Sequence, residues 1–258
     1  MAARKPANDE AAGASSSQSM RAQLVLRELI GAGELKPGER ITELAMVERL
    51  AMSRTPIRTA LVRLQEEGLL EPLPGGGFIV REFSEGDIHD AIELRGTLEG
   101  LAARLAAERG VPAALMAEVR ECLAQIDGLL APPKLTDSAF AAYADHNGRL
   151  HALLSEMSGS PLLQRQIERA VTLPFASPNG FVMADRGGPR ARDRLMIAHE
   201  QHHAMVEAIA RGEGTRAEAL AREHARNAQR NLATVLANHQ RMRHVAGAMM
   251  LRRRAALR

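Results

Sequence analysis

Aromatic residues, cysteines and long apolar runs are scarce in this sequence of 258 residues, and each scarcity excludes a class of protein. Aromatics make up 2% of the chain, as five Phe, one Tyr and no Trp. The chain therefore lacks the stacking surfaces that modules for single-stranded nucleic acids need. The single cysteine, Cys122, excludes an internal disulfide and any cysteine-rich zinc or iron–sulfur site. No apolar run approaches the roughly 18 residues of a membrane helix.

The N-terminal segment MAARKPANDEAAGASSSQSM has no apolar stretch of the kind found in secretory signals. We therefore expect a cytoplasmic protein with no membrane partner, in which Cys122 is reduced and serves as a small apolar side chain. Residues 1–19 are rich in Ala and Ser and show no apolar period. They are predicted to form a disordered arm.

The residues that are abundant favour packed helices, because the 45% of hydrophobic side chains are almost all aliphatic. The net charge is +3 and the isoelectric point about 9.6. This charge does not mark a nucleic-acid surface, since residues 1–85 hold 11 Lys and Arg against 12 Asp and Glu. A DNA-binding face must be located from the placement of individual residues instead.

The first third of the chain has the pattern of a winged helix-turn-helix. Apolar periods and turn residues predict helices at about 20–30, 42–50 and 53–67. Two β-prone runs follow, LLEPL and FIVREF, around the glycines at 75–77. The order of helices, tight turn and hairpin predicts a winged helix-turn-helix domain over residues 20–82.

The rest of the chain is predicted to be helical. Punctuation by Gly and Pro separates helices at about 85–109, 112–130, 135–157, 160–173, 190–211 and 215–240. Short connections between helices predict an all-α antiparallel bundle over residues 83–240. The irregular stretch 174–189 is long enough to cover a pocket, and residues 241–258 form a basic tail. The expected fold class is thus mainly α.

The third helix begins with SRTPIR, which suits a recognition helix. Arg54 and Arg58 are four residues apart and share a face, from which each guanidinium can bind guanine or phosphate. Ser53 and Thr55 place hydroxyl groups at the N-terminus of the helix, a favourable position for phosphate. The alternative is a pair of arginines on an ordinary solvated face.

The segment ELAMVERLAMSRTPIRTALVRLQEEGLLEPLPGGGFIV resembles the DNA-binding domain of GntR-family transcription regulators. The resemblance covers residues 20–82. It implies a homodimer that binds a palindromic operator in double-stranded DNA. Arg54, Thr55 and Arg58 fall at positions that read DNA in that family, and Gly76 and Gly77 fall at the tip of the wing.

Four residues of the helical region have a spacing that suits a metal ion. Asn147 and His151 lie four apart on one predicted helix and so share a face. His202 and His224 each lie 11 residues from Glu213, the centre of a predicted helical hairpin, which places them level with each other. Three imidazoles and one oxygen would suit zinc, nickel or another divalent ion. Each histidine taken alone is as consistent with a surface or core position.

Three segments resemble the FCD effector domain of the FadR-type branch of GntR regulators: AIELRGTLEGLAARLAAE, NGRLHALLSEMSGSPLL and HHAMVEAIARGEGTRAEALAREH. Many members bind a divalent metal through an Asp, a His four residues later and two further His residues 22 apart. His151, His202 and His224 match that pattern. Asn147 stands where Asp is usual, which implies weaker metal binding and a site that favours an anionic effector.

Other polar residues are candidates for the effector site. Arg95 resembles a family arginine that faces the pocket, where it would pair with a carboxylate; an interhelical arginine is the alternative. Asn227 lies one turn beyond His224 and is a weaker candidate. His199 and His203 are alternative metal ligands, with His203 expected to point away from the site.

The sequence therefore predicts a transcription regulator, a repressor released by a small organic acid bound at a metal site. Two alternatives stay open. One is a metal-dependent enzyme that uses the three histidines, although no HExxH or comparable motif supplies a general base. The other is a metal-free regulator that responds to acyl-CoA, which the intact histidines argue against.

Overall fold

The computed structural model describes residues 7–173, 176–180, 182, 190–236 and 250–251. The chain divides into two compact units. Met1–Ser84 and Gly247–Arg258 form the first, and Glu85–Ala246 form the second. The boundary lies two residues beyond the predicted limit of the DNA-binding domain.

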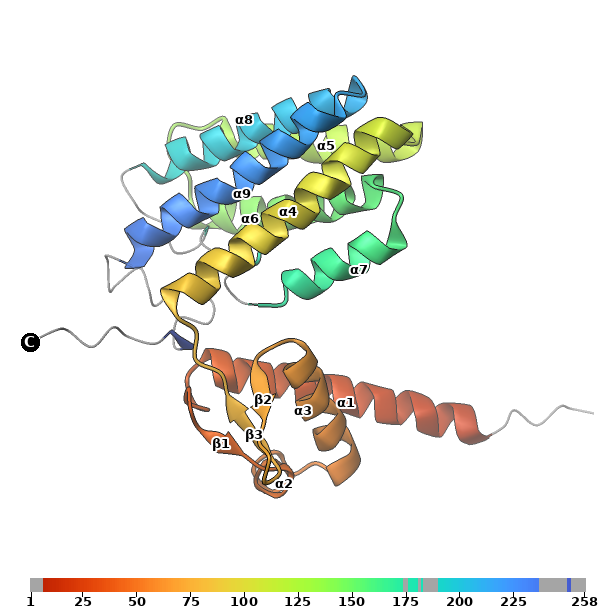
Figure 1. Ribbon diagram of the computed structural model, residues 1–258, viewed down its shortest axis with the longest axis vertical. Coiled ribbons are helices and arrows are strands. Elements are labelled where there is room, and N and C mark those ends of the chain that lie inside the picture. The colour runs from red at the N-terminus through yellow and green to blue at the C-terminus, as the bar shows by residue number, and fades with distance from the viewer. Residues whose placement is uncertain (1–6, 174–175, 181, 183–189, 237–249, 252–258) are drawn as a thin grey trace, which may run out of the picture. The chain divides into compact units, whose positions relative to one another are not determined.

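The first unit is a winged helix-turn-helix, as predicted (Figure 1). Its elements are α1 (Ala7–Gly31), β1 (Arg40–Ile41), α2 (Glu43–Leu50), α3 (Arg54–Glu66), β2 (Leu70–Pro72) and β3 (Phe78–Val80). The strands form an antiparallel sheet in the order β1-β3-β2, with Ile41 opposite Phe78 and Leu70 opposite Val80. Strand β1 was not predicted, because two residues are too few to show an alternating pattern.

The expectation of a disordered arm at residues 1–19 is wrong from Ala7 onward, where α1 begins. The segment between Ala7 and Ser19 contains several alanines, and alanine has the highest helix propensity of all residues. This propensity lets the helix continue N-terminal to its apolar, packed part. Residues 1–6 lie outside the described part of the chain.

Local interactions set the turn between α2 and α3. The Thr42 hydroxyl caps α2 by accepting a hydrogen bond from the Ala45 N–H at 3.2 Å. Ala51 then ends α2 in the left-handed conformation, with φ at +52°. Pro56, Ile57, Ala60, Leu61 and Leu64 form the buried face of α3. The opposite face of α3 is thereby left to solvent.

Part of the segment expected to be a basic tail, residues 241–258, packs against the first unit. The Met250 side chain is buried, and its carbonyl accepts a hydrogen bond from the Phe83 N–H at 2.8 Å. Phe83 also forms a parallel bridge with Leu251. Met250 and Leu251 therefore contact Phe83, which follows the wing, and do not belong to a solvated tail. The other residues of that segment lie outside the described part.

The second unit is a helical bundle (Figure 1). Its helices are α4 (Glu85–Arg109), α5 (Ala113–Leu130), α6 (Asp137–Met157), α7 (Pro161–Ala170), α8 (Ala191–Ala210) and α9 (Gly214–Leu236). The ends of the predicted helices agree with the observed ends within three residues. The exception is the last helix, which was predicted to end at residue 240; residues 237–240 lie outside the described part of the chain. Most of the predicted loop at 174–189 is also outside them.

The core of the bundle is aliphatic, with Phe140 and Tyr143 as its aromatic members. Cys122 belongs to this core, and its thiol donates to the His146 carbonyl at 3.4 Å. Burial raises the pKa of the Cys122 thiol, which keeps it protonated and unreactive. This agrees with the role expected for it.

Helices α4 and α9 lie side by side in the bundle (Figure 1). Their close approach requires glycine on α4: a Cβ at Gly96 would lie 2.5 Å from the Ala225 Cβ, and one at Gly100 would lie 2.9 Å from the Arg222 Cγ. The contact involves Arg222 and Ala225 of α9, and it therefore also sets the position of residue 224 between them. Among the described helices, none combines the length and the apolar character needed to cross a bilayer.

Candidate functional site

The residues predicted to read DNA lie on the exposed face of α3. Ser53, Arg54, Thr55 and Arg58 are all exposed. The Arg58 side chain is 74% accessible, and its Nε lies 3.5 Å from the Glu43 Oε1. This weak surface pair leaves the guanidinium able to turn toward a base or a phosphate. The four residues are thus accessible to a partner, and their contact with DNA stays a prediction.

The two wing glycines differ in their surroundings. Both have positive φ, +84° at Gly76 and +81° at Gly77. A Cβ on Gly77 would lie 2.7 Å from the Ile41 carbonyl oxygen, whereas nothing lies within 4 Å of one on Gly76. Gly77 is therefore required by the packing of the wing on β1. Arg40, which sequence reasoning missed, donates to the Gly76 carbonyl at 3.0 Å and is exposed beside the wing tip.

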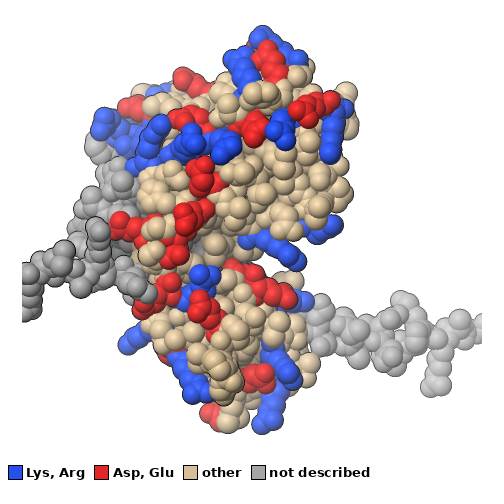
Figure 2. Space-filling model, viewed as in Figure 1, with Lys and Arg blue, Asp and Glu red and all other residues tan. Residues whose placement is uncertain are grey.

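Charge alone does not mark this surface. On the face drawn in Figure 2, the N-terminal unit carries Lys and Arg interspersed with Asp and Glu. This agrees with the nearly balanced charges of residues 1–85. The charge distribution on the face drawn therefore does not locate a DNA-binding surface.

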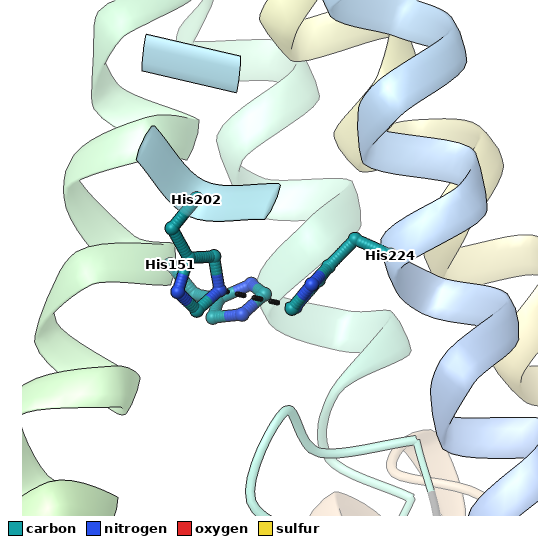
Figure 3. A group of neighbouring side chains, drawn as sticks. All are labelled: His151, His202 and His224. Atoms are coloured by element: carbon teal, nitrogen blue, oxygen red, sulfur yellow. Dashed lines mark hydrogen bonds between the residues drawn. The ribbon is translucent and has the colours of Figure 1, made fainter. Parts of the chain in front are cut away.

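Three histidines from three helices point toward one another inside the bundle (Figure 3). They are His151 on α6, His202 on α8 and His224 on α9. The Nε2 atoms of His202 and His224 are 3.1 Å apart, and one ring nitrogen from each of the three lies within 4.8 Å of the others. The equal spacing of His202 and His224 from the hairpin loop thus predicted their juxtaposition.

Hydrogen bonds orient two of these imidazoles. His151 Nδ1 lies 2.8 Å from the Glu99 Oε1, and His224 Nδ1 lies 3.2 Å from the Gln201 Oε1. The His151 Nε2 is buried with no hydrogen-bond partner among the described residues. An oxygen at one ring nitrogen, with the other nitrogen free, is the usual arrangement around a metal-bound histidine. The donor set fits a divalent ion that prefers imidazole nitrogen.

Burial keeps the imidazoles of His202 and His224 neutral, which is the form that binds metal. It lowers the pKa of His202 well below its ordinary value, and His224 and His151 lower it further. Burial together with His151 lowers the pKa of His224 to about 3. A bound cation would therefore not have to displace protons from these two rings near neutral pH.

Glu99 contacts this group of histidines and was missed by the sequence analysis. Burial alone would raise its pKa, but Arg95 and His151 outweigh that effect and lower the pKa to about 2. The buried Glu99 is therefore an anion that holds His151 from α4. Its position four residues after Arg95 was visible in the sequence, but its contact with α6 was not.

Asn147 is buried near the three histidines, on the same helix as His151. Its amide nitrogen donates to the Asn179 Oδ1 at 2.8 Å, and the Asn179 amide donates in turn to the Ala144 carbonyl at 2.7 Å. This leaves the Asn147 oxygen as its possible ligand atom. Asn147 and His224 both line one small cavity of about 60 Å³.

Arg95 lines the same small cavity. Its side chain is 2% accessible, and its Nε lies 3.6 Å from the Glu99 Oε2. Two of its nitrogens, Nε and Nη1, have no hydrogen-bond partner among the described residues. Burying a guanidinium with unused donors is costly. A carboxylate in the cavity would satisfy them.

Asn227 also lines this cavity. Its amide nitrogen donates to the Gln201 Oε1 at 2.6 Å, which joins it to the residue that orients His224. A larger cavity of about 590 Å³ is lined by residues that include Glu99, His151 and Asn179. Its volume is in the range that small organic ligands occupy.

His199 and His203, considered above as alternative ligands, do not join the three histidines. Both contact Asp127 on α5 instead. Together with Asp127 they form a separate group of potential ligands. Their partner could not be predicted from the sequence, because Asp127 lies 72 residues before His199.

Two family models match the chain. Residues 90–227 match the FCD domain, and residues 19–80 match "Bacterial regulatory proteins, gntR family". The chain is 45% identical over 74 residues to the Nta operon transcriptional regulator of Aminobacter aminovorans, covering 29% of this chain and 35% of that protein. It spans less than half the length of the first two curated relatives it matches.

Longer matches exist to other regulators. The HTH-type transcriptional regulator LutR of Bacillus subtilis is 27% identical over 223 residues, which cover 78% of this chain and 94% of that protein. The structure of Escherichia coli McbR/YncC matches with a TM-score of 0.56 and 23% identity, over 85% of this chain and 97% of that one. This structural match supports the fold.

Proposed function

Because the chain belongs to the FCD-containing GntR regulators, it is a transcription regulator and not an enzyme, and we propose that it is a repressor released by a small organic acid. The acid would bind beside a divalent metal in the helical unit. We infer that the protein acts in the cytoplasm, because its target is the chromosome. The observation that carries the proposal is the group of buried histidines next to the unsatisfied guanidinium of Arg95.

His151, His202 and His224 would hold the metal, with the Asn147 oxygen as a fourth ligand. The ion would supply positive charge and open coordination positions for an anionic group. Zinc and nickel both suit this imidazole-rich set. Because Asn147 is neutral, a bound divalent ion keeps most of its charge, which favours an acid as effector.

Arg95 would bind the carboxylate of that acid. Arg95 lines the cavity that Asn147, His224 and Asn227 also line, and two of its donors have no hydrogen-bond partner among the described residues. Asn227 would help to position His224 through Gln201, because the Gln201 side chain contacts both residues. A metal-free regulator of the acyl-CoA type has no need for three converging histidines, so this alternative is less well supported.

At the other end of the protein, Ser53, Arg54, Thr55 and Arg58 would contact DNA in the major groove. Gly76 would let the wing backbone approach the minor groove, and the neighbouring Arg40 adds a positive charge there. We propose that two chains bind a palindromic operator as a homodimer.

The metal proposal is tested by measuring the metal content of tag-free protein and of His202→Ala. We expect the variant to hold one equivalent less than the wild type, because it loses a completely buried ligand. Circular dichroism confirms that the variant is folded. Equal metal content in the two proteins would contradict the assignment.

The DNA contact is tested with Arg58→Ala, measured by gel shift at fixed salt because non-specific binding depends steeply on salt. We expect a loss of about 1–3 kcal/mol and relaxed preference at one base pair. Arg120→Ala, an exposed arginine of α5, is the matched control and should bind normally. Unchanged operator preference in Arg58→Ala would rule out base reading by this residue.

A further inference from the structure

A second group of potential metal ligands lies on α8, outside the centre described above. Asp127 of α5 meets His199 and His203 of α8. The Asp127 Oδ1 lies 2.9 Å from the His199 Nε2 and 3.1 Å from the His203 Nε2. The two Nε2 atoms are themselves 3.2 Å apart. Three potential ligand atoms thus form a nearly equilateral triangle.

We propose that Asp127, His199 and His203 form a second binding site for a first-row divalent cation such as zinc. Two histidines at positions i and i+4 share one face of a helix, as chelating pairs do. The carboxylate from α5 completes a set of two nitrogens and one oxygen. The inference is independent of the proposed function.

The distances fit a metal ion well. Zinc binds imidazole nitrogen and carboxylate oxygen at about 2.0–2.1 Å, so neighbouring ligand atoms in a tetrahedron are about 3.3 Å apart. The three observed separations, 2.9, 3.1 and 3.2 Å, differ from this value by a few tenths of an ångström. Small side-chain rotations would admit the ion.

Hydrogen bonding accounts less well for the same arrangement. If Asp127 accepted a bond from each imidazole, both Nε2 atoms would carry a hydrogen. Both N–H groups would then point at the same Asp127 oxygen, with their nitrogens only 3.2 Å apart. A cation removes this conflict, because both nitrogens present lone pairs to it.

Accessibility distinguishes this site from the inner one. The His199 side chain is 4% accessible, while those of Asp127 and His203 are 55% and 45% accessible. One ligand is therefore fixed in the bundle and two face solvent. The remaining coordination positions would hold water, and the ion would exchange more readily than one at His202.

The test is a count of metal equivalents on full-length, tag-free protein that has been stripped with a chelator and titrated with Zn²⁺. We expect the wild type to bind one equivalent more than Asp127→Ala or His203→Ala. Both substitutions are at exposed side chains, so the variants should fold. Any ion held by His239 or His244 cancels in this difference.

Two further variants give the matched comparison. His89→Ala removes an exposed histidine of α4 and should keep the full count. His224→Ala should lose the inner equivalent and keep the outer one, which separates failure of this inference from failure of the inner site. The proposal is overturned if Asp127→Ala or His203→Ala binds as many equivalents as the wild type.

Discussion

At the scale of single residues, the inner site depends on groups that hold the ligands as much as on the ligands. Glu99 is buried against His151 and Arg95, and it is ionised because its interactions with these two side chains outweigh the cost of burial. It fixes the ring of His151 so that the Nε2 faces the other histidines. Neither the ionisation of Glu99 nor the orientation of the His151 ring depends on a residue next to His151 in the sequence.

Replacing Glu99 with Gln should weaken metal binding by about 10–100-fold, because the amide is a poorer acceptor for the His151 ring. The measurement is competition for Zn²⁺ with a chromophoric chelator. Glu118→Gln is the control, since Glu118 pairs with Arg149 at the surface, and its affinity should equal that of the wild type. An unchanged affinity in Glu99→Gln would show that Glu99 does not support the site.

At the scale of helices and turns, the sequence predicted the features that residues close together in the chain determine. Thr42 caps α2 at the predicted start of that helix, and the 11-residue spacing on each side of Glu213 brings His202 and His224 together. The contacts of Glu99 and Asp127 were not predicted. They depend on how α4 and α5 pack against helices distant in the sequence, which apolar periodicity does not specify.

Ala51 is a strained position in the turn between α2 and α3, since it is a non-glycine residue at φ +52°. Ala51→Gly should stabilise the DNA-binding unit by roughly 0.5–1 kcal/mol, because relief of the strain exceeds the added entropy of the unfolded chain. Urea denaturation measures the change. Ala45→Gly, at an exposed helical position of α2, should have the opposite effect; a loss of stability in both variants would contradict the argument.

Gly96 sets the distance between α4 and α9, and so the position of His224. Gly96→Ala should destabilise the bundle by about 1–3 kcal/mol, because the new methyl group overlaps Ala225. The thermal midpoint and the zinc affinity should both fall. Gly128→Ala, with no atom within 4 Å of the new methyl group, should be neutral or stabilising. Equal behaviour of the two variants would mean that the helices can separate freely.

At the scale of the whole molecule, the sequence was sufficient for the fold class, the winged helix and the convergence of the three histidines. It failed where weak or non-local information decides the structure. The Ala-rich start of α1 has no apolar period, and the two residues of β1 are too few to form a pattern. Met250 is buried beside Phe83, although 167 residues separate them and a basic segment surrounds Met250.

An acid bound in one unit can control DNA binding by the other only if it binds the two DNA-binding states with different affinities. Arg95 is the residue that separates effector binding from metal binding. It lines the cavity but is not a metal ligand. Arg95→Met should therefore keep its metal and its affinity for DNA and lose the response to the acid.

The most direct test is a titration of operator binding against a panel of small carboxylic acids. It would use DNA from upstream of the protein's own gene, at fixed salt, with metal-loaded and chelator-stripped protein. We predict specific binding that one acid releases from the loaded wild type, but not from the stripped protein or from Arg95→Met. Release by the same acid at the same concentration in all three would contradict the central claim that the metal and Arg95 together form the effector site.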